Sequence, residues 1–386
     1  VKAAGRVNVI GEHTDYALLP VLPVALQFGI TIAAVADASG VVEAGSAAFP
    51  EAVRLERPPQ PVDGWGRYLA AVLRLLEGRS PGRGARLWIE SDLPPDGGLS
   101  SSSALTVGLL WALDRVWHLG LTRGEVIELA VGAERSVGIE GGTMDQTVIT
   151  LAEEGAGLRI DFFPPAVRPA PIDPGIRLVA ADSGRRAPKT GAMRDLYDSR
   201  VLGVRMAGAL LGRQLGMDPG TPPLPGRLGG AADLIGPARD LPGTATAREV
   251  AAATGVSLEA LCGLTARSLP PELPVPVGAI AAHVLGEAQR VERAEAALAQ
   301  GDLADLGRLL DQSHRSLGEF GVSTPELDEL VEVLGDAGAA GARVTGAGGG
   351  GYVVAAVSPE RVGAVVEAGL AYAGSGSIFD NPYCMR

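Results

Sequence analysis

Lysine is almost absent from this chain, since Lys2 and Lys189 are the only two among 386 residues. A phosphate-binding loop of the Walker A type requires a lysine directly after a run of glycines, and neither lysine stands in such a place. The net charge is −12, so the chain also lacks the excess of positive charge that affinity for a nucleic-acid backbone requires. We therefore expect no nucleic-acid partner, and any anionic ligand must be bound locally.

Cysteine and long apolar runs are scarce as well. Cys262 and Cys384 lie too far apart in the sequence to form a metal-binding or redox motif, and they indicate no disulfide framework. No apolar run approaches the ~20 residues that a membrane-spanning helix needs, and the first residues show no signal-peptide pattern. We expect a cytoplasmic protein without a membrane partner. Because Val1 already lies in a predicted strand, we also expect residues before it in the natural protein.

The composition is that of a folded protein, with 46% hydrophobic and 20% charged residues. A chain of 386 residues exceeds what one hydrophobic core usually serves, so we predict two domains. The sequence becomes rich in proline near residue 164, in "PPAVRPAPIDPG". We take this segment as the boundary and predict domains at 1–165 and 166–386. Apolar and β-branched runs predict strands over 1–11 and 28–36, whereas helical spacing predicts helices over 64–77, 123–136 and 282–300.

The segment "LPPDGGLSSSSAL", residues 93–105, joins a glycine loop to the start of an apolar helix. Unpaired N–H groups and the helix dipole make such a helix start attractive to phosphate without a lysine. The alternative is an ordinary serine N-cap. One hydroxyl is enough for a cap, so the run Ser100–Ser103 indicates a further partner.

Two acidic residues follow this helix. Asp145 in "EGGTMDQ" comes after two glycines, where an Asx-turn or a helix cap is one interpretation, and a carboxylate beside a reacting hydroxyl is the other. Glu134 either pairs with Arg135 on the surface or is the second ligand of a Mg²⁺ that keeps most of its waters. The glycine-rich segment 344–354 is either a bulged turn or a place where the backbone closely approaches a ligand or the phosphate-loop helix.

The segment "GRVNVIGEHTDY", residues 5–16, places four ionisable groups around a predicted strand. Arg6 and Glu12 could form an ion pair, and His13 could be a buried core histidine. Alternatively, Glu12, His13 and Asp15 provide the donors and acceptors that a ring of sugar hydroxyls needs.

These motifs resemble a known family. Segment 5–16 resembles the galactokinase signature, segment 93–105 the serine-rich phosphate loop of the GHMP kinases, and "RVTGAGGGGYV" their third motif. Further segments extend the similarity over nearly the whole chain, namely "GWGRYL", "AERSVGIEGGTMDQ", "YDSRV", "HVLGEAQRV" (283–291) and "SHRSLGEFGVSTPELDELV". The resemblance implies an α+β, two-lobed GHMP kinase fold of mixed sheets with helices, with the active site between the lobes. "AERSVGIEGGTMDQ" is closest to the N-acetylgalactosamine kinase and eukaryotic galactokinase group, which leaves the sugar's 2-substituent open.

The resemblance also implies an activity, namely transfer of the γ-phosphoryl group of ATP to the anomeric hydroxyl of galactose by a monomeric enzyme. The implied catalytic residues are Arg6 and Asp145. The implied sugar-binding residues are Glu12, His13, Asp15, Gly142 and Tyr197. The implied ATP-binding residues are Trp65 and Tyr68 at the adenine and Gly98, Ser100, Ser101, Ser102 and Ser103 at the phosphates, with Mg²⁺ at Ser102 and Glu134.

Three alternatives remain at this point. The first is a different substrate, as in an N-acetylgalactosamine or other sugar 1-kinase. A non-catalytic sensor of galactose and ATP is disfavoured because its serine loop would be disrupted, and here the loop is intact. A GHMP kinase for mevalonate or homoserine is disfavoured because those substrates carry a carboxylate and need cationic contacts. Asp96 departs from the family pattern, which has glycine there.

Overall fold

The computed structural model describes residues 1–93, 98–138, 142–186, 192–218, 220, 223–263, 269–373 and 379–380. By their contacts, these residues form two compact units. Unit 1 contains residues 1–7 and 24–155, and unit 2 contains residues 8–23 and 156–380. The segment 8–23 thus belongs with the C-terminal half of the chain. The division at residue 165 stays a prediction from the sequence.

The largest sheet has five strands in the order β1-β2-β5-β3-β4. The strands are β1 (Lys2–Ile10), β2 (Leu22–Asp37), β3 (Val42–Ser46), β4 (Val53–Leu55) and β5 (Gly84–Ser91). Pairing is antiparallel between β2 and β5 and parallel between β3 and β5, so the sheet is mixed. Leu87 and Ile89 are buried while Trp88 between them is exposed, which is the alternation expected of a sheet with one covered face. β1 and β2 confirm the strands predicted at 1–11 and 28–36.

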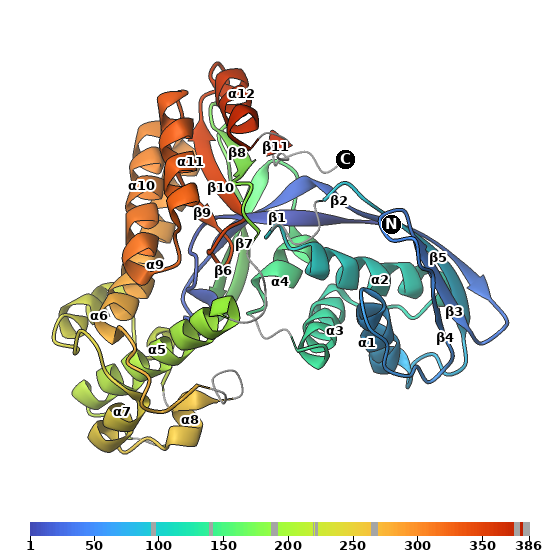
Figure 1. The fold of residues 1–386 in the computed structure, drawn as a ribbon, viewed down its shortest axis with the longest axis horizontal. Helices are drawn as coiled ribbons and strands as arrows, with labels where there is room; N and C mark the ends of the chain where they lie inside the picture. Colours follow the sequence, from blue (N-terminus) through green and yellow to red (C-terminus); the bar gives the residue numbers. More distant parts are fainter. Residues whose placement is uncertain are drawn as a thin grey trace. The chain divides into compact units, whose positions relative to one another are not determined.

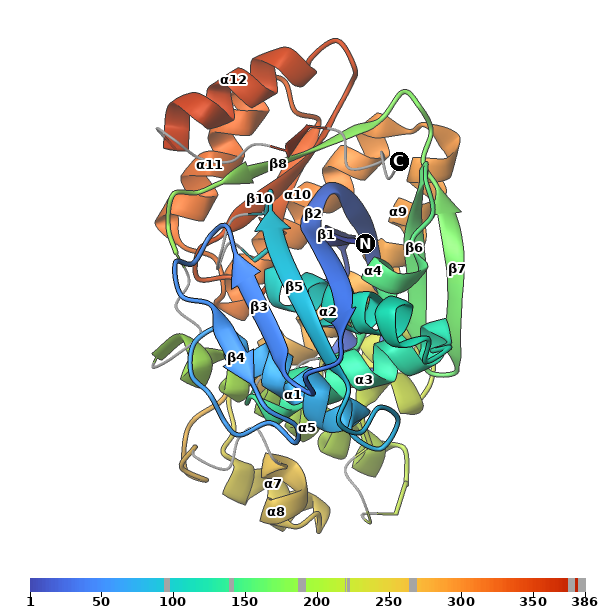
Figure 2. The same ribbon diagram turned by 90° about the vertical axis from the view of Figure 1, so that its right-hand side faces the viewer.

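Helices of unit 1 cover one face of this sheet (Figure 2). They are α1 (Gly66–Leu76), α2 (Ser101–Trp117), α3 (Arg123–Ser136) and α4 (Met144–Leu151). Helix α2 approaches the strands closely at Gly108, where an added Cβ would lie 3.1 Å from Ile32 and 3.3 Å from Ala3. A capping box between Thr122 and Glu125 fixes the start of α3. The helices predicted at 64–77 and 123–136 are confirmed.

Unit 2 contains an antiparallel sheet in the order β11-β8-β10-β9 and a separate hairpin. The sheet strands are β8 (Arg177–Asp182), β9 (Gly341–Thr345), β10 (Tyr352–Val357) and β11 (Phe379–Asp380), and the hairpin strands are β6 (Ala156–Phe162) and β7 (Pro165–Pro171). Every residue of β9 and β10 is buried. These two strands therefore lie in the centre of a hydrophobic core.

The helices of unit 2 surround that core. They are α5 (Ala192–Gln214), α6 (Ala231–Ala238), α7 (Ala247–Thr254), α8 (Leu258–Cys262), α9 (Val277–Gln300), α10 (Leu303–Phe320), α11 (Pro325–Asp336) and α12 (Val362–Ala373), with short turns η1 (Asp15–Ala17) and η2 (Pro225–Arg227). Helices α10 and α11 pack along β9 and β10, and α9 packs against α10 (Figure 1). The predicted helix 282–300 is the greater part of α9.

The glycine-rich third motif forms the turn between β9 and β10. Gly346 and Gly348–Gly351 all have positive φ, a region that glycine adopts without strain. A Cβ at Gly348 would lie 2.4 Å from the backbone oxygen of Val322, so no larger residue fits there. The motif therefore forms a bulged turn packed against neighbouring backbone, and its approach to a ligand stays a prediction.

In the part of the chain that the structure describes, no helix is long and apolar enough to cross a membrane.

Candidate active site

Asp145 and Arg6 form a bidentate ion pair in unit 1. Asp145 is the second residue of α4, and Arg6 lies in the middle of β1. Arg6 Nε donates to Asp145 Oδ1 at 2.7 Å, and Arg6 Nη2 donates to Asp145 Oδ2 at 2.8 Å. The third donor, Arg6 Nη1, reaches the carbonyl oxygen of Gly98 at 2.8 Å. The N-cap of α4 is Thr143, so Asp145 is neither the cap nor part of a local turn.

Ser100 completes this cluster. It occupies the N-cap position of α2 but makes no capping hydrogen bond with its side chain. Instead, its hydroxyl donates to Asp145 Oδ2. The backbone at Ser100 has φ +61°, the left-handed region that few residues other than glycine adopt. An ordinary serine cap is therefore the wrong interpretation of Ser100, although its position at the start of the helix was predicted correctly.

The other predicted phosphate-loop residues lie at the same helix start. Ser101, Ser102 and Ser103 form the first turn of α2, with Ser103 buried and the other two half-buried. Gly98 has φ +81°. Residues 94–97, Asp96 among them, lie outside the described residues. The unpaired N–H groups of this first turn and the positive end of the helix dipole suit an anionic ligand.

Glu134 is buried near the end of α3 and does not form the surface ion pair with Arg135 that was one alternative. Its Oε1 accepts a hydrogen bond from Thr106 Oγ1 at 3.1 Å, and the same hydroxyl lies 3.2 Å from the carbonyl oxygen of Ser102. Burial, with the nearby charge of Asp145, raises the pKa of Glu134. A positive charge placed here would stabilise the ionised carboxylate.

The groups around Glu134 suit a hard cation. These groups present oxygen atoms that can serve as metal ligands, and among the residues that the structure describes the buried side-chain oxygen of Gln146 has no hydrogen-bond partner. Mg²⁺ prefers oxygen ligands and retains several waters, so one or two protein groups suffice. Among the described side chains, no group of three or more His, Cys, Asp or Glu residues is arranged to hold a metal. A cation held by only one or two protein groups is consistent with the oxygen atoms around Glu134 and with the lack of a larger ligand cluster.

The predicted sugar-binding residues Glu12, His13 and Asp15 lie in unit 2, in and next to η1. Glu12 is buried, and its Oε2 accepts from Arg343 Nη2 at 2.6 Å. Asp15, the first residue of η1, is half-buried. Glu12 thus pairs with Arg343 while Arg6 pairs with Asp145, so the alternative of an Arg6–Glu12 ion pair is wrong.

His13 lies in an aromatic cluster of unit 2. Its ring centroid is 4.9 Å from that of Phe320 and 6.0 Å from that of Tyr197, and its Nδ1 is 2.9 Å from the hydroxyl of Tyr16. Burial lowers the pKa of His13 to about 3, so the ring is neutral near pH 7. A neutral ring can both donate and accept, as a sugar hydroxyl requires. The sequence singled out Tyr197 but not Tyr16 or Phe320.

Gly142, Trp65 and Tyr68 lie in unit 1. Gly142 directly precedes the N-cap of α4, three residues from Asp145. Trp65 is the N-cap of α1, and its ring stacks with that of Phe49 at 6.3 Å between centroids. Tyr68 in the first turn lies under the guanidinium of Arg67. Phe49 was missed because no motif marks it.

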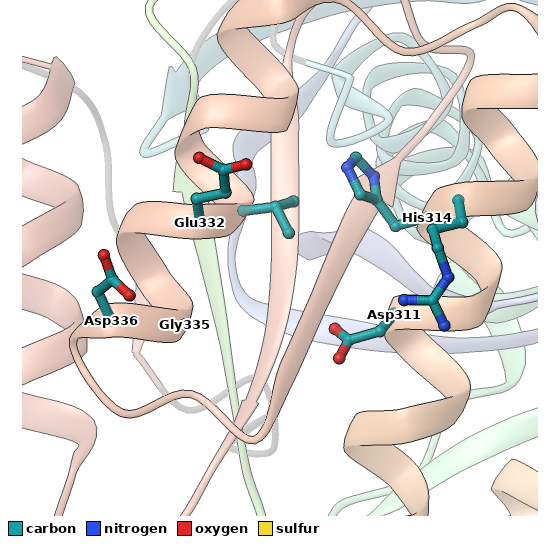
Figure 3. Close-up of a pocket in the computed structure, with 7 residues that line it drawn as sticks. Asp311, His314, Glu332, Gly335 and Asp336 are labelled. Carbon is teal, nitrogen blue, oxygen red and sulfur yellow. The ribbon is translucent and has the colours of Figure 1, made fainter.

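Unit 2 also contains a pocket that includes none of the predicted residues. Its volume is about 390 Å³, and it lies between α10 and α11. The lining residues are Asp311, His314, Arg315, Val331, Glu332, Gly335 and Asp336. Figure 3 shows Glu332 and Asp336 on one helix and Asp311 and His314 on the other. We assign no role to this pocket.

Comparison with known families agrees with the three sequence motifs. The galactokinase galactose-binding signature matches residues 1–36, the N-terminal domain of GHMP kinases matches 67–153, and their C-terminal domain matches 294–374. A galactokinase of Chloroflexus aggregans is 35% identical over 377 residues, covering 96% of this chain and 86% of the relative. A galactokinase of Mycobacterium tuberculosis is 33% identical over 377 residues, covering 93% and 89%.

Solved structures give the same result. The crystal structure of Lactococcus lactis galactokinase complexed with galactose has a TM-score of 0.76 and 26% identity, over 99% of this chain and 92% of that one. The mevalonate kinase of Methanococcus jannaschii, at 16% identity and a TM-score of 0.64 over 100% and 98% of the two chains, shares the fold. The predicted two-part α+β GHMP kinase fold is confirmed. Since curated relatives match nearly the whole chain at more than 30% identity, the chain belongs to the galactokinase family of the GHMP kinases.

Proposed function

We propose that this protein transfers the γ-phosphoryl group of ATP to the anomeric hydroxyl of galactose, giving galactose 1-phosphate and ADP. Family membership supports both substrates, since the named relatives are galactokinases and the Lactococcus lactis structure contains galactose. The observation that supports the chemistry most strongly is the Arg6–Asp145–Ser100 cluster at the start of α2. It combines a carboxylate, a cation and a helix start suited to phosphate.

Asp145 is the group proposed to accept or orient the sugar proton. An ionised carboxylate can accept about four hydrogen bonds. Asp145 Oδ2 accepts from Arg6 and Ser100, whereas Oδ1 accepts only from Arg6 Nε among the described residues. Oδ1 therefore retains a lone pair for the anomeric hydroxyl. As the bond between that oxygen and the γ-phosphorus forms and the bond to the β-phosphate oxygen breaks, the hydroxyl proton passes to Asp145.

Arg6 and the start of α2 are proposed to stabilise negative charge. Arg6 is positively charged at all relevant pH values and lies against Asp145, so it favours charge that develops on the reacting oxygens. Gly98 and Ser100–Ser103 would bind the ATP phosphates through backbone N–H groups and hydroxyls. Trp65 and Tyr68 would contact the adenine ring, with Phe49 stacked on Trp65 as an additional aromatic surface.

Mg²⁺ is proposed to bind at Ser102 and Glu134 when ATP is present. The ion neutralises phosphate charge, which is what it supplies to phosphoryl transfer in general. The buried Glu134 carboxylate and the unpartnered oxygen of Gln146 support this assignment. Neither residue is placed to contact the sugar in this proposal.

Glu12, His13, Asp15, Gly142 and Tyr197 are proposed to bind the sugar hydroxyls. A buried acid, a neutral imidazole and a tyrosine near one another suit hydrogen bonding to a polyol. We further propose a cytoplasmic monomer that binds no nucleic acid. The net charge of −12 supports the last point, and size-exclusion chromatography tests the oligomeric state.

The discriminating experiment is one coupled assay of ADP release with galactose, N-acetylgalactosamine, glucose and arabinose, each with ATP and Mg²⁺. We expect release with galactose far above the sugar-free background. A faster rate with N-acetylgalactosamine would assign the chain to the other sugar kinases of this branch. Galactose binding without any ADP release would identify a sensor and contradict the proposal.

A further inference from the structure

We propose that Glu287 and Arg343 are positioning residues that hold Glu12 in place for sugar binding. Neither residue has a role in the mechanism above, and the inference rests on the proposed function because it assumes that Glu12 binds the sugar. All three residues belong to unit 2, with Glu287 on α9 and Arg343 on β9. Glu287 and Arg343 are both completely buried, so neither acts at the surface.

Arg343 binds the segment before Glu12 and its carboxylate together. Its Nε donates to the carbonyl oxygen of Val9 at 2.7 Å, and its Nη2 donates to the carbonyl oxygen of Asn8 at 2.6 Å. The same Nη2 donates to Glu12 Oε2 at 2.6 Å. The planar guanidinium thus fixes the carboxylate of Glu12 relative to the end of β1, which a flexible lysine cannot do.

Glu287 binds the backbone on the other side of the turn. Its Oε1 accepts from the backbone N–H of Gly11 at 2.9 Å and lies 3.4 Å from that of Glu12. Gly11 has φ +99°, and a Cβ there would lie 2.8 Å from the Cα of Val21, so the chain turns tightly and inward at this residue. Buried N–H groups require an acceptor, and Glu287 provides it.

His283 holds the remaining backbone group of Glu12. Its Nε2 lies 3.1 Å from the carbonyl oxygen of Glu12, and its Nδ1 lies 2.9 Å from the hydroxyl of Ser316. A carbonyl oxygen only accepts, so Nε2 carries the hydrogen and Nδ1 accepts from Ser316. Burial lowers the pKa of His283 to about 4, so this neutral tautomer persists near pH 7. The N–H, the carbonyl and the carboxylate of Glu12 are therefore all held.

The charges alternate through this buried network. Glu12 pairs with Arg343, Arg343 Nη1 lies 3.9 Å from Glu287 Oε1, and Glu287 Oε2 accepts from Arg290 at 2.7 Å. Burial by itself would raise the pKa of Glu287, but the charges of Arg290 and Arg343 lower it to about 2. Glu287 is therefore ionised near pH 7.

Stability alone does not explain such a network. Apolar residues of similar volume often stabilise a core as well as a buried ion network does, because the ions lose their hydration. What the charged network adds is a single orientation of the Glu12 carboxylate before the sugar arrives. Preorganisation of this kind increases affinity by reducing the ordering that binding requires.

Two conservative variants test this role. Glu287→Gln keeps an oxygen for the backbone N–H groups but removes the negative charge between Arg290 and Arg343. Arg343→Lys keeps the positive charge but removes the planar guanidinium that binds Glu12 and the backbone together. We expect the Kd and KM for galactose to rise at least about tenfold in each, the size typical of a lost charged hydrogen bond. The KM for ATP and kcat should stay close to those of the parent, which a general loss of structure would not allow.

Glu295→Gln is the matched control. Glu295 lies two turns further along α9 and is also held by arginines, with Arg168 Nη2 at 2.8 Å from its Oε2 and Arg159 Nη1 at 3.3 Å. The substitution removes the same charge from the same helix, but within the described ranges the hydrogen bonds and ion pairs of Glu295 go to Arg159 and Arg168 and not to residues 8–16. Its galactose affinity should equal that of the parent.

Calorimetric titration with galactose separates the outcomes. Parent-like galactose affinity in both test variants would overturn the inference while leaving the proposed function intact. Equal increases in KM for galactose and ATP would also overturn it, because the network would then be structural only. A parent protein that neither binds nor phosphorylates galactose would instead overturn the proposed function, and this inference with it.

Hydrogen exchange on the unsubstituted protein gives a test that does not depend on variants folding. If Glu287 holds the amides of Gly11 and Glu12, peptides covering residues 9–16 should exchange as slowly as the centre of α9. Rapid exchange of these two amides would overturn the inference.

Discussion

Both carboxylate oxygens of Asp145 accept hydrogen bonds from Arg6, at 2.7 Å and 2.8 Å, and Ser100 donates to one of them. These three residues come from β1, α4 and the start of α2. A carboxylate held at two oxygens cannot rotate, so its remaining lone pair has a fixed direction. The cluster is therefore prepared for a proton acceptor or an orienting group before substrates bind.

Asp145→Asn should lower kcat at least about 100-fold while leaving galactose affinity near that of the parent, because the amide keeps the shape but cannot accept the proton. Steady-state kinetics and calorimetry measure the two quantities. Asp161→Asn is the control, since Asp161 also pairs with arginine, in its case Arg159 and Arg168, but belongs to unit 2. A kcat close to that of the parent in Asp145→Asn would show that Asp145 only holds Arg6.

Ser100→Gly should lower kcat about tenfold, because it removes a hydrogen bond to a charged group. Glycine suits the left-handed backbone at this position, where φ is +61°, whereas alanine does not. Ser100→Ala should therefore lower kcat as much as Ser100→Gly does and should also lower the thermal stability. If Ser100→Gly has the parent's kcat, the hydroxyl does not assist Asp145.

Glu134→Gln should raise the Mg²⁺ concentration needed for half-maximal rate at least about tenfold, since the amide is a weaker ligand and carries no charge. The galactose KM should not change. Rates measured over a Mg²⁺ series at saturating galactose give the answer. An unchanged Mg²⁺ dependence would mean that Glu134 is only a hydrogen-bonded core residue.

Stability should fall as the pH drops below neutral. Burial lowers the pKa of His13 to about 3 and that of His283 to about 4, from 6.5. At pH values between the pKa of the folded state and 6.5, the unfolded chain binds more protons at these histidines than the folded chain does. The free energy of unfolding therefore decreases with falling pH. Between about pH 7.5 and about pH 5.5, His13 and His283 should each lower the free energy of unfolding by about 1 kcal/mol. Urea unfolding at the two pH values measures this change.

A histidine variant separates this effect from other titrations. His283→Asn should reduce the loss of stability between the two pH values. An equal pH dependence in the parent and in His283→Asn would contradict the assignment of a neutral, buried ring.

Local sequence predicted the residues that lie in motifs. Strand β1 with Arg6 and the serine run at the start of α2 follow short-range patterns of apolar spacing and helix-start residues. Helix α4 was not predicted, although Asp145 was singled out as an acid that follows two glycines. The partner of each residue was harder to predict. The serine run predicted a helix start correctly, but only the fold shows that Ser100 turns from a capping position toward Asp145.

Long-range partners were not predictable from local patterns. Arg343 is 331 residues from Glu12 in the sequence, and no spacing rule joins them. His283 and Glu287 carried a signal that was available, because they stand four residues apart on a helix whose neighbouring positions Ile280, Val284 and Val291 are apolar and buried. Polar residues on a buried helix face require partners, and here those partners include the sugar-signature segment.

The most direct test of the proposed activity is phosphorus NMR of a reaction that contains this protein, ATP, Mg²⁺ and galactose. The account predicts that galactose 1-phosphate and ADP appear in equal amounts, with no phosphate on any other hydroxyl. ADP without a sugar phosphate, a phosphate at another position of galactose, or no reaction at all would contradict it.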